Sequence, residues 1–120
     1  MLRICLLALL LAAPGARAAC SDSPGAHMDW SGCSKERLIL RGQALQGAKF
    51  EHAVLVGIDF ASANLEGASF ASAELHRASF RGALLERALL EKTYAVRTNF
   101  SGARAAGANL EKAELHRSNL

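Results

Sequence analysis

The sequence predicts an all-β solenoid, a chain that coils around one axis and turns a corner every five residues. Three observations support this fold class. From residue 40 to residue 120, 15 of the 17 positions numbered by multiples of five are Leu or Phe, and we call these positions centres. The residue two places before a centre is Ala in 11 of the 17 cases. No insertion or deletion breaks this phase over residues 36–120.

A period of five fits neither of the regular amphipathic structures. An α-helix repeats about every 3.6 residues and a strand about every two, so either would scatter the centres over several faces. A coil with one corner in each pentad keeps both the centre and the small residue before it inside. All the phenylalanines are centres, and we expect them to pack in the core rather than to hold a cofactor: Phe50, Phe60, Phe70, Phe80 and Phe100.

The start of the chain, residues 1–18, has the layout of a secretory signal peptide. A positive start at Arg3 precedes an apolar run from Ile4 to Ala13, and Ala16 and Ala18 supply the small residues that a signal peptidase reads. The apolar run is too short to span a bilayer, which takes about 20 residues. We therefore expect cleavage after Ala18 and a periplasmic or secreted mature protein without a transmembrane segment.

The two cysteines left after cleavage, Cys20 and Cys33, are expected to form one disulfide in an oxidising compartment. Two free thiols are the alternative. A zinc site is disfavoured, since only His27 lies near these cysteines and four ligands are usual. A lipoprotein signal, with Cys20 acylated, is a second interpretation of the N-terminus. Arg17 weighs against it, because an aliphatic residue is normal three places before the acylated cysteine.

Removing the signal peptide lowers the formal net charge of the chain. The full sequence carries 14 Lys and Arg against 11 Asp and Glu, which gives +3, and the signal contains Arg3 and Arg17. The mature chain therefore has a net charge of 12 − 11 = +1. So weak a charge gives no reason to expect a nucleic-acid partner, and it does not support a strongly acidic mimic of DNA.

Two pentads carry a recognisable motif. Residues 63–67 (ANLEG) and 108–112 (ANLEK) resemble the A-(N/D)-L-x-x signature of pentapeptide-repeat proteins. Residues 29–33 (DWSGC) resemble the opening of exported members of that family. The resemblance implies a right-handed quadrilateral β-helix, in which each pentad forms one side and four pentads form a coil. The 17 pentads then give about four coils.

The expected organisation has three parts. Residues 1–18 are the signal peptide, residues 19–35 are a capping segment that contains the disulfide, and residues 36–120 are the solenoid. We expect Trp30 to cover the end of the first coil, since solenoids need capped ends.

Residues 20 apart are expected to stack in columns on the surface of such a coil. One column, two residues after its centres, contains Arg77, Arg97 and Arg117. Exposed apolar residues grouped with Arg and Tyr are typical of contact surfaces, so this face is the candidate partner-binding site. The alternative is a solvated face on which Glu74 and Glu114 pair with the arginines. The neighbouring columns supply the apolar part of the site: Val54, Val56, Tyr94 and Val96.

The residue pattern predicts no enzyme activity, no metal and no cofactor. His76 and His116 share a column, but two coils separate them by roughly 10 Å, which is too far for one metal ion. The carboxylates at Glu86, Glu91 and Glu111 are expected on convex outer faces, and no nucleophile is spaced to meet a base. The sequence therefore predicts a non-catalytic module of the cell envelope, with a protein-binding or structural role and an unidentified protein partner.

Two further expectations concern partners. Some cytoplasmic members of the family resemble DNA and bind DNA gyrase, so regulation of gyrase or another topoisomerase is the alternative function. The export signal and the near-neutral charge disfavour it. Exposed strand edges invite association, and residues 101–120 carry no polar cap, so we expect end-to-end pairing of two copies through this last coil.

Overall fold

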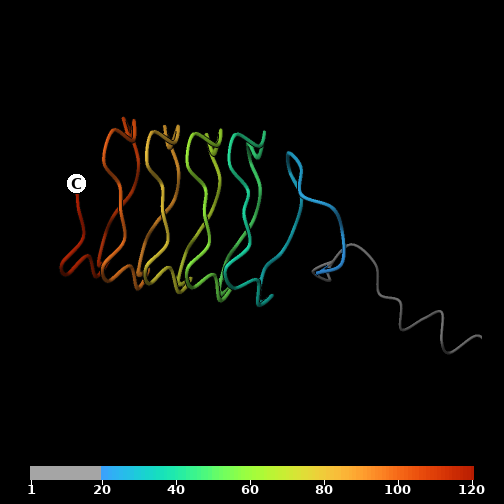
Figure 1. Cartoon of the computed structure of the whole chain (residues 1–120), viewed down its shortest axis with the longest axis horizontal. Helices are drawn as coiled ribbons and strands as arrows, with labels where there is room; N and C mark the ends of the chain where they lie inside the picture. Colours follow the sequence, from blue (N-terminus) through green and yellow to red (C-terminus); the bar gives the residue numbers. More distant parts are fainter. Residues whose placement is uncertain (1–19) are drawn as a thin grey trace, which may run out of the picture.

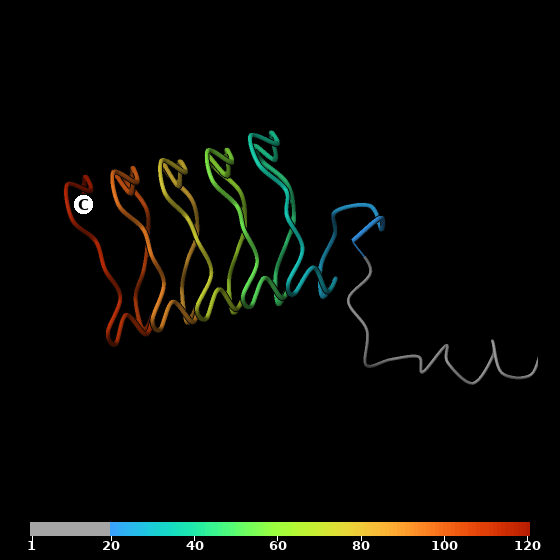
Figure 2. The same cartoon turned by 90° about the horizontal axis from the view of Figure 1, so that it is seen from below.

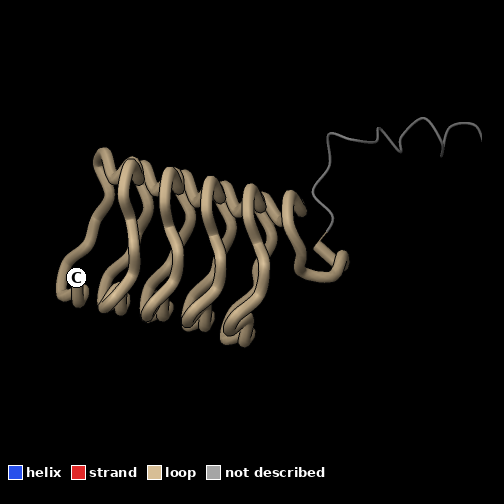
Figure 3. Tube along the Cα trace, turned by 90° about the horizontal axis from the view of Figure 1, so that it is seen from above, coloured by secondary structure: helices blue, strands red, loops and turns tan. Residues whose placement is uncertain are grey.

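The structure is a computed structural model that describes residues 20–120, so the predicted signal peptide and its cleavage site lie outside the described residues. The chain winds into a rod of stacked coils, with residue 120 at the opposite end of the rod from residue 20 (Figure 1). Over these residues the backbone forms neither helices nor extended strands, and its coils pair through isolated bridges (Figure 3).

Fifteen parallel bridges join the coils, and each pairs two residues that lie 20 apart in the sequence. The bridging residue is always the one before a centre, as in the bridges from Asp59 to Ser79 and from Ser79 to Asn99. Because this spacing equals four pentads, each coil has four sides, and the coils repeat along the rod (Figure 2). The first bridge joins Asp29 to Lys49, so the periodic ladder already includes part of residues 19–35.

Each side that is followed by a further coil makes three backbone hydrogen bonds to the matching side of that coil. On the side centred on Leu65, the N–H of Leu65 donates to the Leu84 carbonyl at 2.8 Å, and that of Gly67 donates to Glu86 at 2.9 Å. The Leu84 N–H donates back to Ala63 at 3.0 Å. This pattern leaves the N–H of the residue after each centre outside the ladder, and such a group needs another acceptor or water.

An Asn or Asp before the centre supplies that acceptor. The Oδ1 of Asn64 accepts the N–H of Glu66 at 3.1 Å, and that of Asp59 accepts the N–H of Ala61 at 3.0 Å. A short polar side chain that bonds the backbone two residues on is an Asx-turn, which starts a corner. The hydrogen bond gives a physical reason for the Asn or Asp in the repeat signature.

Every corner is a β-turn whose third residue has a positive φ, as in a type II turn. In the corner after Phe60, the Ala63 N–H donates to the Phe60 carbonyl at 2.9 Å, and Ser62 has a φ of 59°. From His27 to Arg117, every residue at this corner position has φ between 57° and 72°. Eight are Gly, and the other eleven occupy a region that costs an L-residue about 1–2 kcal/mol.

The centres fill the axis of the rod. Phe60, Phe80 and Phe100 stack on one side, with ring centroids 5.2 Å and 5.0 Å apart, and Phe70 stacks on Phe50 at 4.8 Å on the opposite side. The two stacks meet edge to face, for example at 5.5 Å between Phe70 and Phe80. Full burial of each such side chain stabilises the fold by roughly 1.5–3 kcal/mol relative to exposure.

Trp30 lies over the first coil. Its side chain is buried and meets Phe50 edge to face at a centroid distance of 6.2 Å. Its indole N–H donates to the Asp22 carbonyl at 3.3 Å, and the Lys35 Nζ lies 4.5 Å above the ring. The sulfur atoms of Cys20 and Cys33 lie at bonding distance, with Cα atoms 5.6 Å apart. The expected staple and the expected cap thus lie at the same end of the core.

Candidate partner-binding site

Four arginines stack at one corner of the rod, with Gly57 at the remaining level. Their φ angles lie between 58° and 60°, in the region that favours glycine. Five of the eleven non-glycine residues at corner positions are Arg, and four of these five share this corner. We call this column the arginine corner: Arg37, Arg77, Arg97 and Arg117.

A shallow hollow lies beside the middle of the arginine corner. It is lined by Val56, His76, Arg77, Val96 and Arg97. The Val96 N–H is one of the groups left outside the ladder, and it donates to His76 Nδ1 at 3.3 Å. At other corners this N–H is accepted by an Asn or Asp that precedes the centre. Here the residue before the centre Ala95 is Tyr94, whose side chain has no acceptor near its own backbone, so the imidazole of His76 accepts the hydrogen bond instead. The hydrogen bond fixes the ring between the two valines.

The structure separates the predicted site into two parts. Val56, Val96, Arg77 and Arg97 come together around the hollow, and Arg117 continues the corner in the last coil. The other two apolar residues, Val54 and Tyr94, lie in the bridge column before the centres and do not line the hollow. Tyr94 is 46% exposed and Val54 is half-buried.

The structure bears on one part of the alternative interpretation, the pairing of the arginines with glutamates. In residues 20–120 the ion pairs are Arg41–Asp59, Arg87–Glu66 and Arg104–Glu86. Neither Glu74 nor Glu114 pairs with an arginine of the corner, although both are exposed in the neighbouring column. Arg77, Arg97 and Arg117 are thus exposed to solvent and make no ion pair within residues 20–120.

Sequence reasoning missed three arginines near this site. Arg37 belongs to the arginine corner, but the centre of its pentad is Lys35 rather than Leu or Phe, so the pattern does not point to it. Arg41 and Arg81 line a second, polar hollow at the next corner, together with Ser62, Ser79 and Asn99. Their signal is visible in the sequence, since each directly follows a centre of the same column.

Arg41 also shapes the charge of its neighbour. Its Nε donates to Asp59 Oδ2 at 2.6 Å. Burial raises the pKa of Asp59, but the Ala61 N–H and the Arg41 guanidinium lower it by more, so the pKa of this carboxyl lies below its ordinary value. Asp59 is thus ionised at neutral pH, and its charge is balanced by Arg41.

Two other kinds of site, a metal centre and a membrane-spanning helix, are absent from the part of the chain that the structure describes. Residues 20–120 contain no group of three His, Cys, Asp or Glu side chains placed to hold a metal ion. Nor does any helix in this stretch have the length and apolar character that crossing a membrane requires.

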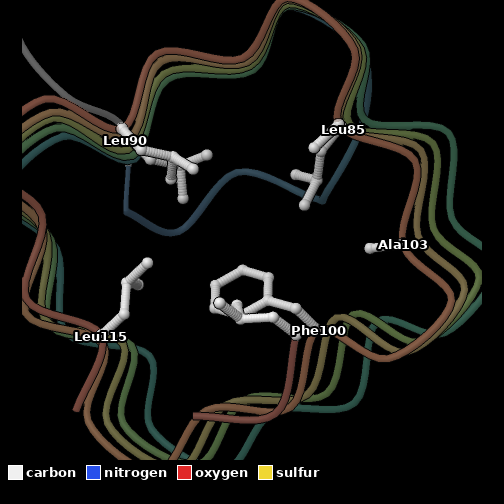
Figure 4. Close-up of a pocket in the computed structure, with 8 residues that line it drawn as sticks. Leu85, Leu90, Phe100, Ala103 and Leu115 are labelled. Atoms are coloured by element: carbon white, nitrogen blue, oxygen red, sulfur yellow. The ribbon is translucent and has the colours of Figure 1, made fainter.

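An apolar hollow opens at the last coil, where no further coil of the described chain covers the centres (Figure 4). Phe100 and Leu115 point into it, and Leu110 and Leu120 are 43% and 77% exposed. The full lining is Leu85, Leu90, Phe100, Ala103, Ala105, Leu110, Leu115 and Leu120.

Comparison with known proteins identifies relatives of this fold. A pentapeptide repeat protein from the thylakoid lumen of Arabidopsis thaliana is 23% identical, with a TM-score of 0.67 over 71% of this chain and 59% of that one. QnrB1, a plasmid-mediated fluoroquinolone resistance protein, is 18% identical, with a TM-score of 0.49 over 78% of this chain and 58% of that one. The chain spans less than two thirds of the length of either. No curated protein sequence matches it.

A family model gives the assignment. The model of pentapeptide repeats matches in eight copies over residues 45–82 and 83–120, which together make 38 + 38 = 76 of the 120 residues. These ranges contain the regular ladder, the corners and the stacked centres described above. The chain therefore belongs to the pentapeptide-repeat family, and its fold is the right-handed quadrilateral β-helix of that family.

Proposed function

We propose that this protein is a non-catalytic protein-binding module of the cell envelope, and that the arginine corner and its hollow contact the partner. One observation carries the proposal: Arg77 and Arg97 lack a carboxylate partner within residues 20–120 and border a hollow whose other walls include Val56 and Val96. Interfaces favour Arg beside apolar groups, and arginine can bind a carboxylate through two parallel hydrogen bonds. The partner surface should therefore present an acidic residue beside an apolar one.

The same residues support a binding role rather than a catalytic one. Catalysis usually needs a concave pocket in which a nucleophile, a base and a stabilising group converge. The candidate site is an open corner, and its imidazole already accepts a backbone hydrogen bond from Val96. Regulation of gyrase by mimicry of DNA would need an acidic surface, whereas this corner is basic.

The location in the envelope is part of the proposal. Residues 1–18 are proposed to direct export, and a Cys20–Cys33 disulfide is proposed to form in the oxidising compartment. Cell fractionation should recover the protein in the periplasm or the medium, with both cysteines protected from thiol reagents by their bond. Recovery in the cytoplasm with two reactive thiols would contradict this part of the proposal.

Affinity capture from periplasmic extract tests the binding site. The wild-type protein is compared with Arg77→Gln, Arg97→Gln, Arg117→Gln and with Val56→Ser, Val96→Ser, and bound proteins are identified by mass spectrometry. A protein that both variants fail to retain is the expected partner. Lys92→Gln with Lys112→Gln, at the adjacent corner one side away from the arginine corner, is the control. If both site variants retain every protein that the wild type retains, the proposal is wrong.

We also propose that two copies pair end to end through residues 101–120. The apolar hollow of the last coil supports this, as do the N–H groups of Ala105, Leu110 and Leu115, which find no acceptor within residues 20–120. The equivalent groups in earlier coils donate to the next coil, so this edge is ready to add strands. Light scattering over a range of concentrations should give a dimer mass, and a monomer at millimolar concentration would contradict the proposal.

A further inference from the structure

Although the net charge of the protein is small, its positive and negative side chains are unevenly distributed around the rod. We call one face of the rod the basic side. It includes the two corners that border it, and its centres are Leu40, Phe60, Phe80, Phe100 and Leu120. This basic side comprises residues 36–42, 56–62, 76–82, 96–102 and 116–120. It carries six arginines against Glu36 and Asp59, so its formal charge is 6 − 2 = +4. The arginines are Arg37, Arg41, Arg77, Arg81, Arg97 and Arg117.

The opposite side has the opposite sign. It comprises residues 26–32, 46–52, 66–72, 86–92 and 106–112, with four Lys and Arg against six Asp and Glu, so its formal charge is 4 − 6 = −2. Two of its acidic residues, Glu91 and Glu111, lie next to Lys92 and Lys112 at their corner. The rod is thus electrically polarised across its width, which a net charge of +1 does not reveal.

The arginines of the basic side form two parallel rows. One row is the arginine corner, and the other is Arg41 and Arg81 at the next corner. Between the rows runs the bridge ladder of this side, which begins at Ile39 and Asp59 and continues through Ser79, Asn99 and Asn119. Ser79 and Asn99 also line the polar hollow described above. Asp59 in the same ladder is paired with Arg41, so it does not repel an incoming anion strongly.

The rows are available for contact. Arg41 is paired, and the other five arginines of the basic side make no ion pair within residues 20–120. At the first level of the same side, Ile39 is 69% exposed and Leu38 is 36% exposed. These two side chains give the basic side an apolar contact point beside its arginines.

We propose that the basic side binds a membrane surface that carries anionic headgroups. Two parallel rows of guanidinium groups on one side of the rod match a two-dimensional array of phosphates, each of which arginine can bind through two hydrogen bonds. A linear polyanion would meet one row only. A protein interface usually has a buried aromatic or apolar anchor at its centre, whereas the centre of this side is Ser and Asn. Ile39 and Leu38 are placed to enter the headgroup layer.

Vesicle co-sedimentation tests this proposal directly. The protein is mixed with vesicles of phosphatidylcholine alone or with phosphatidylglycerol added at about one third. The measured quantity is the ratio of the two partition coefficients. Arg3 and Arg17 also favour anionic vesicles, so the ratio is compared between the wild type and variants that share residues 1–18. The expected ratio is on the order of a hundredfold at low salt, since several arginines approach the surface. It should fall towards one at about 0.5 M salt as the charges are screened.

The decisive comparison is between two double variants that have the same net charge, two units below that of the wild type. Arg41→Gln with Arg81→Gln removes two charges from the basic side and should lower the ratio roughly twenty-fivefold, or about fivefold for each arginine. Lys92→Gln with Lys112→Gln removes two charges from the opposite side and should change it less than about twofold. Equal losses would mean attraction by net charge alone and would overturn the proposal, as would a wild-type ratio near one.

Two measurements keep the result interpretable. Circular dichroism reports whether Arg41→Gln, which breaks the pair with Asp59, still folds. Arg81→Gln alone serves if it does not, because Arg81 makes no ion pair in the described chain. The lipid-binding variants change Arg41 and Arg81 and leave the arginine corner, Val56 and Val96 intact, so capture of a protein partner should persist when lipid binding is lost, and the two failures are distinguishable.

Discussion

The two ends of the rod are built from the same repeat, but they differ in burial. At the first coil Trp30 is 1% exposed and Cys33 is 2% exposed, because the chain from Cys20 onward folds over them. At the last coil Leu110 is 43% exposed and Leu120 is 77% exposed, although both are centres like any other. The difference shows that a centre is buried by the coil stacked above it, not by its own pentad.

The largest expected effect follows from a central phenylalanine. Phe70→Ala should destabilise the fold by about 3–5 kcal/mol, because Phe70 is buried against Phe50, Phe60 and Phe80. In the unpaired monomer, Leu115→Ala in the last coil should cost less than about 1 kcal/mol, because its side chain is only partly buried, whereas end-to-end pairing would cover it and raise this cost. Urea denaturation monitored by circular dichroism measures both. Similar costs would mean that the last coil is covered in solution.

The cap of the first coil gives the next largest effect. Cys20→Ser with Cys33→Ser should lower the free energy of unfolding by about 3 kcal/mol, the usual model value for a loop of this length. Amide hydrogen exchange should accelerate most around Trp30 and least in the last coil. If amide exchange near Trp30 is unchanged, the packing of the indole ring is enough to keep the first coil folded, and the disulfide is not needed there.

Replacing a corner arginine by glycine should have a smaller effect on the free energy of unfolding, and it should stabilise the protein rather than destabilise it. Arg97→Gly should stabilise the protein by about 0.5–1 kcal/mol, since φ at this residue is 60° and Gly accepts it without a Cβ penalty. Lys112→Gly should give less, because only one neighbouring coil of the described chain holds the last coil in place. Thermal denaturation measures both, and capture of a partner should weaken only for Arg97→Gly. A destabilised Arg97→Gly would indicate that the side chain contributes packing that the structure does not contain.

The smallest expected effect depends on pH. The pKa of Asp59 is below its ordinary value, so its ionised form stabilises the fold above the unfolded pKa of about 3.9, and this contribution is lost as the pH falls through the folded pKa. Asp59→Asn keeps the acceptor for the Ala61 N–H and should cost less than about 1 kcal/mol at pH 7 and nothing near pH 2. Asn109→Ala in the last coil removes a neutral acceptor, so its cost should not change with pH.

The period of five was sufficient to predict the fold and the inward residues. A centre such as Phe70 and a bridge residue such as Asn64 differ by one place in their pentads, and the phase fixes which points inward. The columns were predictable for the same reason: Arg77, Arg97 and Arg117 do stack at one corner.

The pairing of long side chains was not predictable from the columns. The sequence allowed Glu74 to pair with the arginines, but the ion pairs within residues 20–120 are Arg41–Asp59, Arg87–Glu66 and Arg104–Glu86. Each joins residues of different columns, so stacking alone does not indicate which side chains pair. Arg41 and Arg81 were overlooked because a corner belongs to two sides at once. Arg41 and Arg81 border the side centred on Phe60 and Phe80 at one edge, and the arginine corner borders the same side at the other edge.

The fixed register has a consequence for how such a surface changes in evolution. Residues 73–77 and 113–117 are identical (AELHR), and the second copy returns to the same columns two coils after the first. Gaining or losing a whole coil would lengthen or shorten the rod with every column intact. Gaining or losing a single pentad would keep the core and rotate everything beyond it by a quarter turn, and Arg117 would then leave its corner. The gain or loss of whole coils thus changes the length of the rod without changing its surface columns, whereas the gain or loss of a single pentad changes the columns.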